Sequence, residues 1–208
     1  MKVLAISGSH RKGKNTATML RLVLAELENG GAQTELVEAA GLNIKYCLAC
    51  NHCLRVAECS IQDDDMAMVA DKMIAADAIV LGSPVYFGNV TARLKALMDR
   101  TRWMHMCENL LDGKVGAAIT IAGLRNGGQE MTQMLLERFL QHHGLHVVEA
   151  RDPHAGVYNI GPMGTLFASL DDAEVRWNRG IMDDTLAVRM CRILGQNLLR
   201  RLKQVSLA

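Results

Sequence analysis

The chain has 208 residues, half of them apolar, and a formal net charge of +1 at pH 7. This length suits one domain with a sizeable core, and the balanced charge gives no field favouring nucleic acid or an anionic membrane surface. No window of about 18 apolar residues predicts a membrane-spanning helix. The amino-terminal stretch MKVLAISGS predicts a buried strand rather than a secretory signal, so we expect a cytoplasmic protein.

Short apolar runs alternate with segments of helical periodicity through most of the chain. Strands are expected at residues 3–6, 34–37, 77–81, 114–121 and 145–148, and helices at 16–28, 63–75, 90–104 and 129–141. The strands are continuous apolar runs, which is typical of a parallel sheet buried on both faces. The pattern predicts a flavodoxin-like or Rossmann-like, doubly wound α/β fold: a five-stranded parallel sheet with helices on both faces.

The rest of the expected single domain, residues 1–208, consists of two less regular regions. A cysteine-rich loop at about 44–62 follows the second strand. A C-terminal extension covers about 150–208, with mixed loop over 150–168 and a helical region at about 171–203, interrupted near Gly180. No repeat or linker divides the chain.

Ligands of such sheets bind at the carboxyl ends of the strands, so the loops after the first, third and fourth strands are candidates. The first, GSHRKGKNT at residues 8–16, leads into a helix amino terminus, where backbone N–H groups and the helix dipole favour an anion. Its candidate phosphate donors are Ser9, Arg11, Asn15 and Thr16. Residues 8–14 also fit G-x-x-x-x-G-K, but Asn15 stands where a nucleotide-binding P-loop requires Ser or Thr.

The third-strand loop, GSPVYFGNV at 82–90, carries the adjacent aromatic residues Tyr86 and Phe87, in a chain with three Tyr and three Phe. The fourth-strand loop, TIAGLRNGGQE at 120–130, is rich in glycine, which lets backbone approach a ligand closely. Each loop alone is compatible with an ordinary turn. Together the three describe one site with a phosphate end and a planar, aromatic-lined end, which is the shape of a flavin mononucleotide (FMN) pocket.

Four of the six cysteines lie in YCLACNHCLRVAEC at residues 46–59, with the spacing C-x2-C-x2-C-x5-C. In a reducing compartment such clustering indicates metal or redox chemistry rather than structural disulfides. The first three match the C-x2-C-x2-C run of bacterial ferredoxins, and Cys59 is the natural fourth ligand of an iron–sulfur cluster. Zinc, which usually takes two C-x2-C pairs with a longer spacer, and free regulatory thiols stay open. Cys107 and Cys191 are expected to be core or surface thiols.

Through GSHRKGKNT, the cysteine run followed by Asp63-Asp64, GSPVYFGNV and GLRNGGQE, the chain resembles the iron–sulfur flavoproteins. This family lies within the NADPH-dependent FMN reductase group of flavodoxin-like proteins, and the resemblance covers roughly residues 1–150. It implies one FMN and one [4Fe-4S] cluster per chain. The implied FMN contacts are Ser9, Arg11, Asn15, Thr16, Pro84, Val85, Tyr86, Phe87, Gly88, Asn89, Ala122, Gly123, Arg125, Gly127, Gly128 and Gln129. The implied cluster ligands are Cys47, Cys50, Cys53 and Cys59.

The resemblance also implies a function: a flavin-dependent oxidoreductase that passes electrons between a ferredoxin-like donor, or NAD(P)H, and a small-molecule or protein acceptor. Family members form homodimers or homotetramers, with the cluster of one chain near a neighbour's flavin. No catalytic acid or base is assigned. Two alternatives are an NAD(P)H-dependent FMN or quinone reductase without a cluster, and a thiol-based redox-sensing binding module. No basic helix indicates a nucleic-acid partner.

Overall fold

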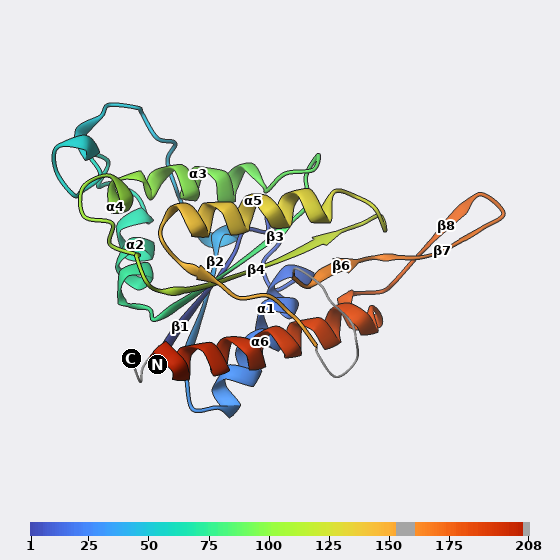
Figure 1. Cartoon of the computed structure of the whole chain (residues 1–208). Coiled ribbons are helices and arrows are strands. Elements are labelled where there is room, and N and C mark those ends of the chain that lie inside the picture. The colour runs from blue at the N-terminus through green and yellow to red at the C-terminus, as the bar shows by residue number, and fades with distance from the viewer. Residues whose placement is uncertain (153–160, 206–208) are drawn as a thin grey trace.

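The fold is built on a central parallel sheet, seen in a computed structural model that describes residues 1–152 and 161–205 (Figure 1). The strands run in the order β2-β1-β3-β4-β5, as expected for a flavodoxin-like sheet. Their bounds are β1 (Lys2–Ser7), β2 (Gln33–Glu38), β3 (Ala78–Pro84), β4 (Val115–Ala122) and β5 (His146–Val147). A sixth strand, β6 (Met163–Thr165), also pairs in parallel with β4, beyond the point where β5 ends.

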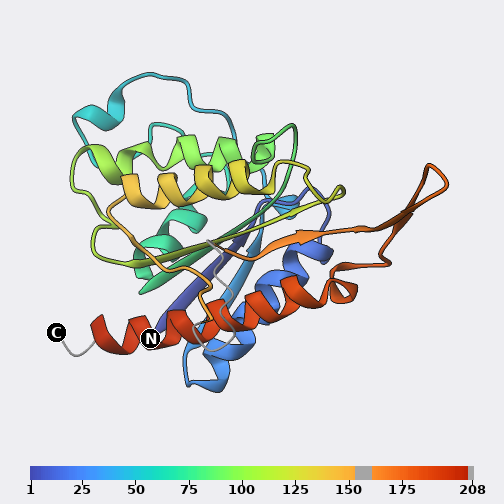
Figure 2. The same ribbon diagram turned by 45° about the vertical axis from the view of Figure 1, so that its right-hand side comes forward.

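Helices cover both faces of this sheet (Figures 1 and 2). One face carries α1 (Asn15–Asn29) and α6 (Thr185–Val205), and the other carries α2 (Met66–Ala75), α3 (Ala92–Arg100), the short α4 (Arg102–Met106) and α5 (Gln129–His142). None of the helices in the described ranges combines the length and apolar character needed to span a bilayer.

Successive residues of one strand pack into the two different cores. Val3 and Ala5 of β1 lie in the core under α1 and α6, whereas Leu4 and Ile6 lie in the core under α2, α3 and α5. Both faces of the strand are therefore buried, which explains why its sequence is apolar at every position from Val3 to Ile6.

The C-terminal region differs from the expected helix over 171–203. β7 (Phe167–Asp171) and β8 (Glu174–Trp177) form an antiparallel hairpin that projects from the body of the molecule (Figure 1). Asp172 and Ala173 make its turn with positive φ angles of 46° and 70°. The long helix α6 begins only at Thr185, after a short 3-10 helix at Ile181–Asp183. Residues 153–160 of the expected loop lie outside the described residues.

Two other helix boundaries shift for local reasons. The helix expected from residue 63 begins at Met66, because the Asp64 carboxylate accepts a hydrogen bond from the Met66 N–H (3.0 Å). The helix expected over 90–104 is divided at Thr101 into α3 and α4. The Thr101 hydroxyl donates to the Met98 carbonyl (2.7 Å) and lies 2.9 Å from Nε2 of His143, at the end of α5.

His143 makes the fold sensitive to acid. Since the Thr101 hydroxyl proton is directed at Met98, the Nε2–H of a neutral His143 donates to Thr101, and no hydrogen-bond partner is found for Nδ1 in the described part of the chain. Burial, with smaller contributions from His105 and His142, lowers the pKa of His143 to about 4. The unfolded chain takes up this proton near the ordinary value of about 6.5. Between these values the unfolded state binds more protons, so stability falls as the pH drops from 6.5 toward 4.

We predict that His143→Gln flattens this acid dependence. The loss of unfolding free energy between pH 7 and pH 4.5, measured by urea denaturation, should be smaller in the variant by about 1–2 kcal/mol, allowing for partial solvent screening. The exposed His146 provides the matched control, His146→Gln. Equal pH dependence of H143Q and wild type would show that His143 is not the acid-sensitive group.

Candidate functional site

Three loops meet at the carboxyl ends of β1, β3 and β4. The Gly8 N–H donates to the Gly82 carbonyl (2.7 Å), and the Thr91 hydroxyl donates to the Gly8 carbonyl (2.6 Å). The Val85 N–H donates to the Ile121 carbonyl (2.8 Å). The first loop is thus bonded to the third-strand loop, and that loop to the end of β4.

The walls of one pocket come from these three loops together. It is lined by Ser9, Arg11, Lys14, Asn15, Thr16, Pro84, Val85, Tyr86, Ile121, Ala122, Gly123 and Leu166. All of these except Lys14, Ile121 and Leu166 are residues that the sequence analysis singled out. Leu166 comes from the C-terminal region, where no sequence signal indicated a contribution to the site.

The phosphate end of the pocket offers cations and backbone donors. Arg11 and Lys14 are exposed, and no side chain caps the amino terminus of α1, whose first N–H groups are therefore available to an anion. The buried Ser9 hydroxyl accepts from the Arg11 N–H (3.0 Å) and shapes the turn. Asn15 is partly committed elsewhere, because its Oδ1 accepts from the Ile181 N–H (3.2 Å).

The third-strand loop separates its two aromatic residues. Tyr86 and Asn89 exchange two backbone hydrogen bonds (2.9 and 3.0 Å) around a turn in which Phe87 and Gly88 have positive φ angles of 51° and 70°. The Tyr86 ring faces the pocket and lies edge-on to His10, with ring centroids 5.4 Å apart. Phe87 is fully exposed at the tip of the turn and does not line the pocket.

The fourth-strand loop is held by the buried amide of Gln129. Its Oε1 accepts from the Gly127 N–H (2.7 Å), and its Nε2 donates to the Leu124 and Arg125 carbonyls (2.9 and 3.1 Å). Gly128, with φ of 98°, touches the neighbouring loop: a Cβ there would lie 2.8 Å from the Gly88 Cα. The glycine is therefore required by the close approach of two loops.

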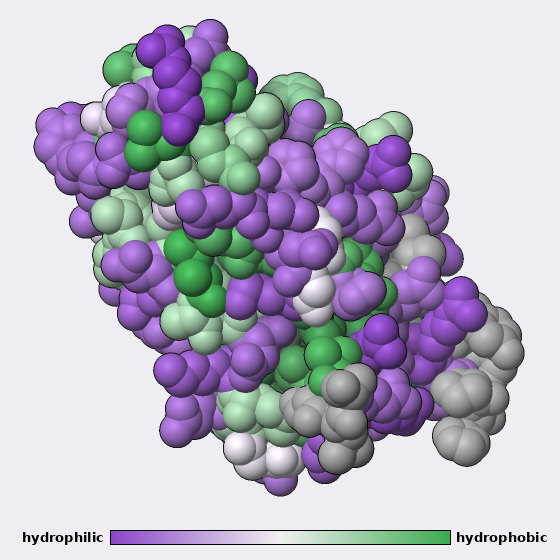
Figure 3. Space-filling model, turned by 60° about the vertical axis from the view of Figure 1, so that its left-hand side comes forward, coloured by the Kyte–Doolittle hydropathy of each residue, from purple (hydrophilic) through white to green (hydrophobic). Residues whose placement is uncertain are grey.

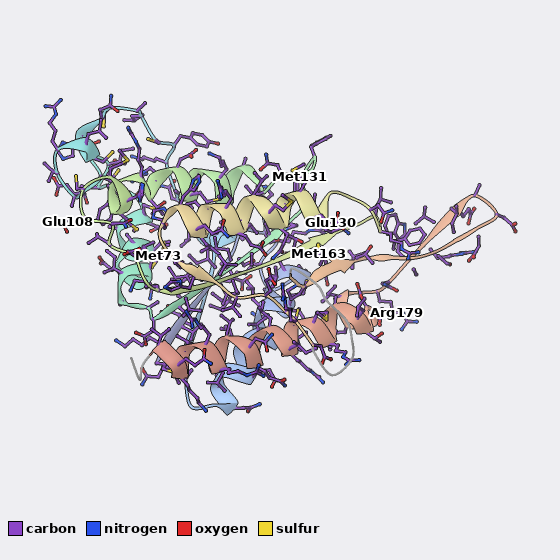
Figure 4. The ribbon with its side chains drawn as sticks, in the orientation of Figure 1. Met73, Glu108, Glu130, Met131, Met163 and Arg179 are labelled. Carbon is purple, nitrogen blue, oxygen red and sulfur yellow. The ribbon has the colours of Figure 1, made fainter. Side chains whose placement is uncertain are left out.

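Several of the predicted FMN contacts lie outside the pocket wall. Arg125, Gly128 and Gln129 instead line a separate depression at the amino-terminal end of α5, together with Asn126, Glu130, Met131 and Met163. Figure 4 shows Glu130, Met131 and Met163 at this end of the helix. Gly88, Asn89 and Gly127 shape the loops without lining the pocket.

The cysteine-rich loop lies at the other end of α3, beside α4 (Figure 1). Its four cysteines line one hollow, together with Leu48, Asn51, Ser60, Ile61, Asp99, Arg100, Arg102 and Trp103. Apolar side chains are exposed in this loop, among them Tyr46 (73%) and Leu48 (71%). Figure 3 shows hydrophobic patches on this side of the surface, among hydrophilic residues. The thiols of the chain are free, and in the described ranges no three His, Cys, Asp or Glu side chains are grouped closely enough for one metal ion.

Arg100, the last residue of α3, joins the two ends of this loop. These ends, at Lys45 and Ile61, form the neck of the loop. Its side chain is 1% exposed and its carboxylate partner, that of Asp64, 0%. Nη1 donates to the Lys45 carbonyl (3.0 Å) and to Asp64 Oδ2 (2.5 Å), while Nη2 donates to the Ile61 carbonyl (3.0 Å) and to Asp64 Oδ1 (3.2 Å). Nε donates to the Cys59 sulfur (3.3 Å). All five N–H groups of the guanidinium therefore have acceptors.

Asp64 is the ionised partner in this arrangement. Burial alone would raise the pKa of its carboxyl, but hydrogen bonds from Arg100 and from the Lys45 and Met66 N–H groups lower the pKa below its ordinary value. The Lys45 N–H lies 2.9 Å from Asp64 Oδ2. The carboxylate thus holds one end of the loop directly and both ends through Arg100.

Other thiols of the loop also have polar neighbours. The Cys50 sulfur lies 3.1 Å from the Ser60 hydroxyl, and the Ser60 hydrogen bond, followed by that of the His52 backbone, lowers the pKa of the Cys50 thiol. The exposed Cys107 donates to the Cys53 carbonyl (3.2 Å). Cys191 is a buried core thiol whose pKa burial raises to about 12.

The sequence analysis did not single out Arg100 or Ser60, since no short spacing links Arg100 to a cysteine 41 residues away.

Comparison with known proteins adds to this geometry. The family model described as NADPH-dependent FMN reductase matches residues 1–156. An iron-sulfur flavoprotein of Methanocaldococcus jannaschii is 41% identical over 163 residues, which cover 77% of this chain and 83% of the relative. One from Archaeoglobus fulgidus is 35% identical over 198 residues, covering 95% and 94%. The second match extends beyond residue 150, where the resemblance was weakest.

Solved structures show the same fold at low sequence identity. An NAD(P)H:quinone oxidoreductase from Methanothermobacter marburgensis superposes with a TM-score of 0.66 at 18% identity, covering 95% of this chain and 96% of that one. An archaeal flavodoxin gives a TM-score of 0.57 at 16% identity, covering 98% and 99%. From the family model and the curated relatives, the chain belongs to the iron–sulfur flavoproteins of the NADPH-dependent FMN reductase family and is a flavin-dependent oxidoreductase.

Proposed function

We propose that this protein passes electrons between a one-electron donor of the ferredoxin type and an acceptor through a [4Fe-4S] cluster and FMN. The observation that supports the proposal most directly is that one hollow is lined by all four cysteines, Cys47, Cys50, Cys53 and Cys59. The chain also has a separate three-loop pocket. Four thiols are a soft ligand set suited to iron–sulfur chemistry. When bound, the cluster supplies one-electron transfer and the flavin links it to two-electron chemistry.

The chain's own part is to bind and orient. FMN would lie in the three-loop pocket, with its phosphate toward Arg11, Lys14 and the amino terminus of α1 and its ring system toward Tyr86. In the other site, the Arg100 and Ser60 donors act on thiols of the proposed cluster ligands. No side chain is required as an acid or base for this role.

The resemblance to the iron–sulfur flavoproteins implies a homo-oligomer, a dimer or tetramer, in which the cluster of one copy lies near the flavin of another. The Thr91 side chain at the start of α3 is bonded to the first loop, whereas Arg100 at its end belongs to the cysteine hollow. The nine residues of this helix separate the sites by about 14 Å. An oligomer that brings the cysteine hollow of one copy to the three-loop pocket of another would shorten this separation.

The first experiment is a cofactor count on protein purified without oxygen. About four iron, four acid-labile sulfide and one FMN per chain are expected for the two-cofactor carrier. Zinc at the cysteines, or FMN without iron after anaerobic reconstitution, would exclude the cluster. Reduction of the flavin by ferredoxin but not by NADPH would support the proposed donor. NADPH reduction of cluster-free protein would instead support a simple FMN or quinone reductase, and a disulfide-linked change without electron transfer a thiol sensor.

We predict that Cys53→Ser reduces the iron and sulfide content at least several-fold and leaves FMN near one per chain. The reason is that the two sites share no lining residue. Iron and sulfide assays beside the flavin absorbance measure both. Cys191→Ser, in the core and away from the loop, is the matched control and should keep both cofactors. Equal iron in C53S and wild type would remove Cys53 from the ligand set.

We predict that Arg11→Ala weakens FMN binding about tenfold without changing riboflavin binding, since the lost guanidinium acts on the phosphate. Fluorescence titration of the apoprotein with each flavin measures the two dissociation constants. Lys12→Ala is the matched control: Lys12 is exposed in the same loop but does not line the pocket. A parallel loss of riboflavin affinity in R11A would argue against a phosphate contact.

A further inference from the structure

We propose that Arg100 is a positioning residue of the cluster site: it holds Cys59 through an N–H···S hydrogen bond while closing the neck of the cysteine loop, and so raises the reduction potential of the bound cluster. The inference rests on the proposed function in one respect, that the four cysteines hold a cluster.

The hydrogen bonds of Arg100 fix the orientation of its guanidinium group. Four of its N–H groups are fixed by the Lys45 and Ile61 carbonyls and by both oxygens of Asp64. A guanidinium is planar, so these four bonds determine the direction in which Nε–H points. That direction is toward the Cys59 sulfur, 3.3 Å away. The hydrogen bond to sulfur therefore follows from the way the neck is closed.

The effect of the hydrogen bond to the Cys59 sulfur on the reduction potential depends on its acceptor and its burial. A hydrogen bond to a ligand sulfur stabilises the more negative, reduced form of a cluster, which raises its potential. The donor is charged and 1% exposed, so solvent and salt screen it little. Asp64 offsets the net charge of the pair, but it takes none of the Nε–H donation. The expected effect thus comes from the N–H···S bond more than from a free positive charge.

The chain provides an independent comparison for this effect. The Cys50 sulfur has its own neighbour, the neutral and exposed Ser60 hydroxyl at 3.1 Å, which would donate to a ligating Cys50 thiolate. Ser60→Ala removes that contact and leaves the neck intact. A neutral, exposed donor should affect the potential less than the buried guanidinium does.

The experiment compares wild type with R100K, D64N and S60A, each purified without oxygen. R100K keeps a positive charge opposite Asp64 but cannot reproduce the five-donor fork. We expect its cluster potential, measured by redox titration, to become more negative by about 59 mV, which is a tenfold change in the ratio of oxidised to reduced cluster. D64N keeps the Nε–H donor and leaves the charge of Arg100 uncompensated, so its potential should shift to more positive values, opposite to that of R100K. S60A alters a different sulfur and should shift the potential to more negative values by less than R100K does.

Flavin content and thermal unfolding report whether each variant is folded. R100K with full iron and an unchanged potential overturns the inference, and so does D64N with a negative shift as large as that of R100K, since the potential would then follow neck closure alone. If R100K is folded but holds no cluster, the comparison passes to D64N and S60A, and a negative shift in D64N at least as large as that in S60A overturns the inference.

Amide hydrogen exchange on cluster-free protein provides a readout that needs no cofactor. Residues 45–61 should exchange faster in R100K than in wild type, while the amides of α5 stay unchanged. Unaltered exchange in the loop overturns the neck-closing role. Wild-type protein that never takes up iron and sulfide overturns the proposed function and this inference together, whereas loaded wild type beside an unaffected R100K overturns the inference alone.

Discussion

The buried pair of Arg100 and Asp64 is the constraint on which the cysteine loop depends. The loop between Lys45 and Ile61 has only one short 3-10 helix, His52–Leu54, in its described structure. Its ends are held together because a single guanidinium bonds to a carbonyl on each side of the neck. Breaking such a pair by removing one partner leaves an uncompensated buried charge, which typically costs 3–5 kcal/mol. The loop that carries four thiols is thus fixed by an ion pair whose disruption would destabilise the folded protein.

The same contact ties the two sites to one helix. Arg100 ends α3, and Thr91 caps its beginning, where the hydroxyl accepts from the Leu94 N–H (3.1 Å) and donates to the Gly8 carbonyl. Gly8 has no room for a side chain, since a Cβ would lie 2.6 Å from the Leu94 Cβ. The first loop therefore packs directly on α3. A shift of this helix along its axis would disturb the three-loop pocket and the neck of the cysteine loop together.

The sequence predicts well those features that depend on patterns over a few neighbouring residues. The apolar runs of β1, β3 and β4 have one arrangement that buries both of their faces, and the loops at their carboxyl ends follow from the parallel order. Arg100 escapes such reasoning, because its acceptors lie 36 to 55 residues away and a helix-ending arginine is ordinarily exposed. The part of the hairpin from about residue 171 to 177 was wrongly expected to be helical, because its turn, Asp172-Ala173, contains no glycine to indicate positive φ. Phe87 beside Gly88 adopts positive φ in the same way, and this separates it from the pocket that Tyr86 faces.

The C-terminal region forms part of the pocket because β5 is short. The short strand leaves the end of β4 free to pair with β6, and the residue that follows β6 lines the pocket. β5 pairs only with Val115 and Gly116, at the start of β4, which leaves Thr120–Ala122 to pair with β6. β6 then leads to Leu166 in the pocket wall, and the Thr165 hydroxyl donates to the Gly123 carbonyl (3.3 Å). The Trp177 ring of the hairpin lies over Gly123, 3.6 Å from where a Cβ would be. The same edge of β4 therefore pairs first with β5 and then with β6, and the segment that follows β6 completes the wall of the pocket through Leu166.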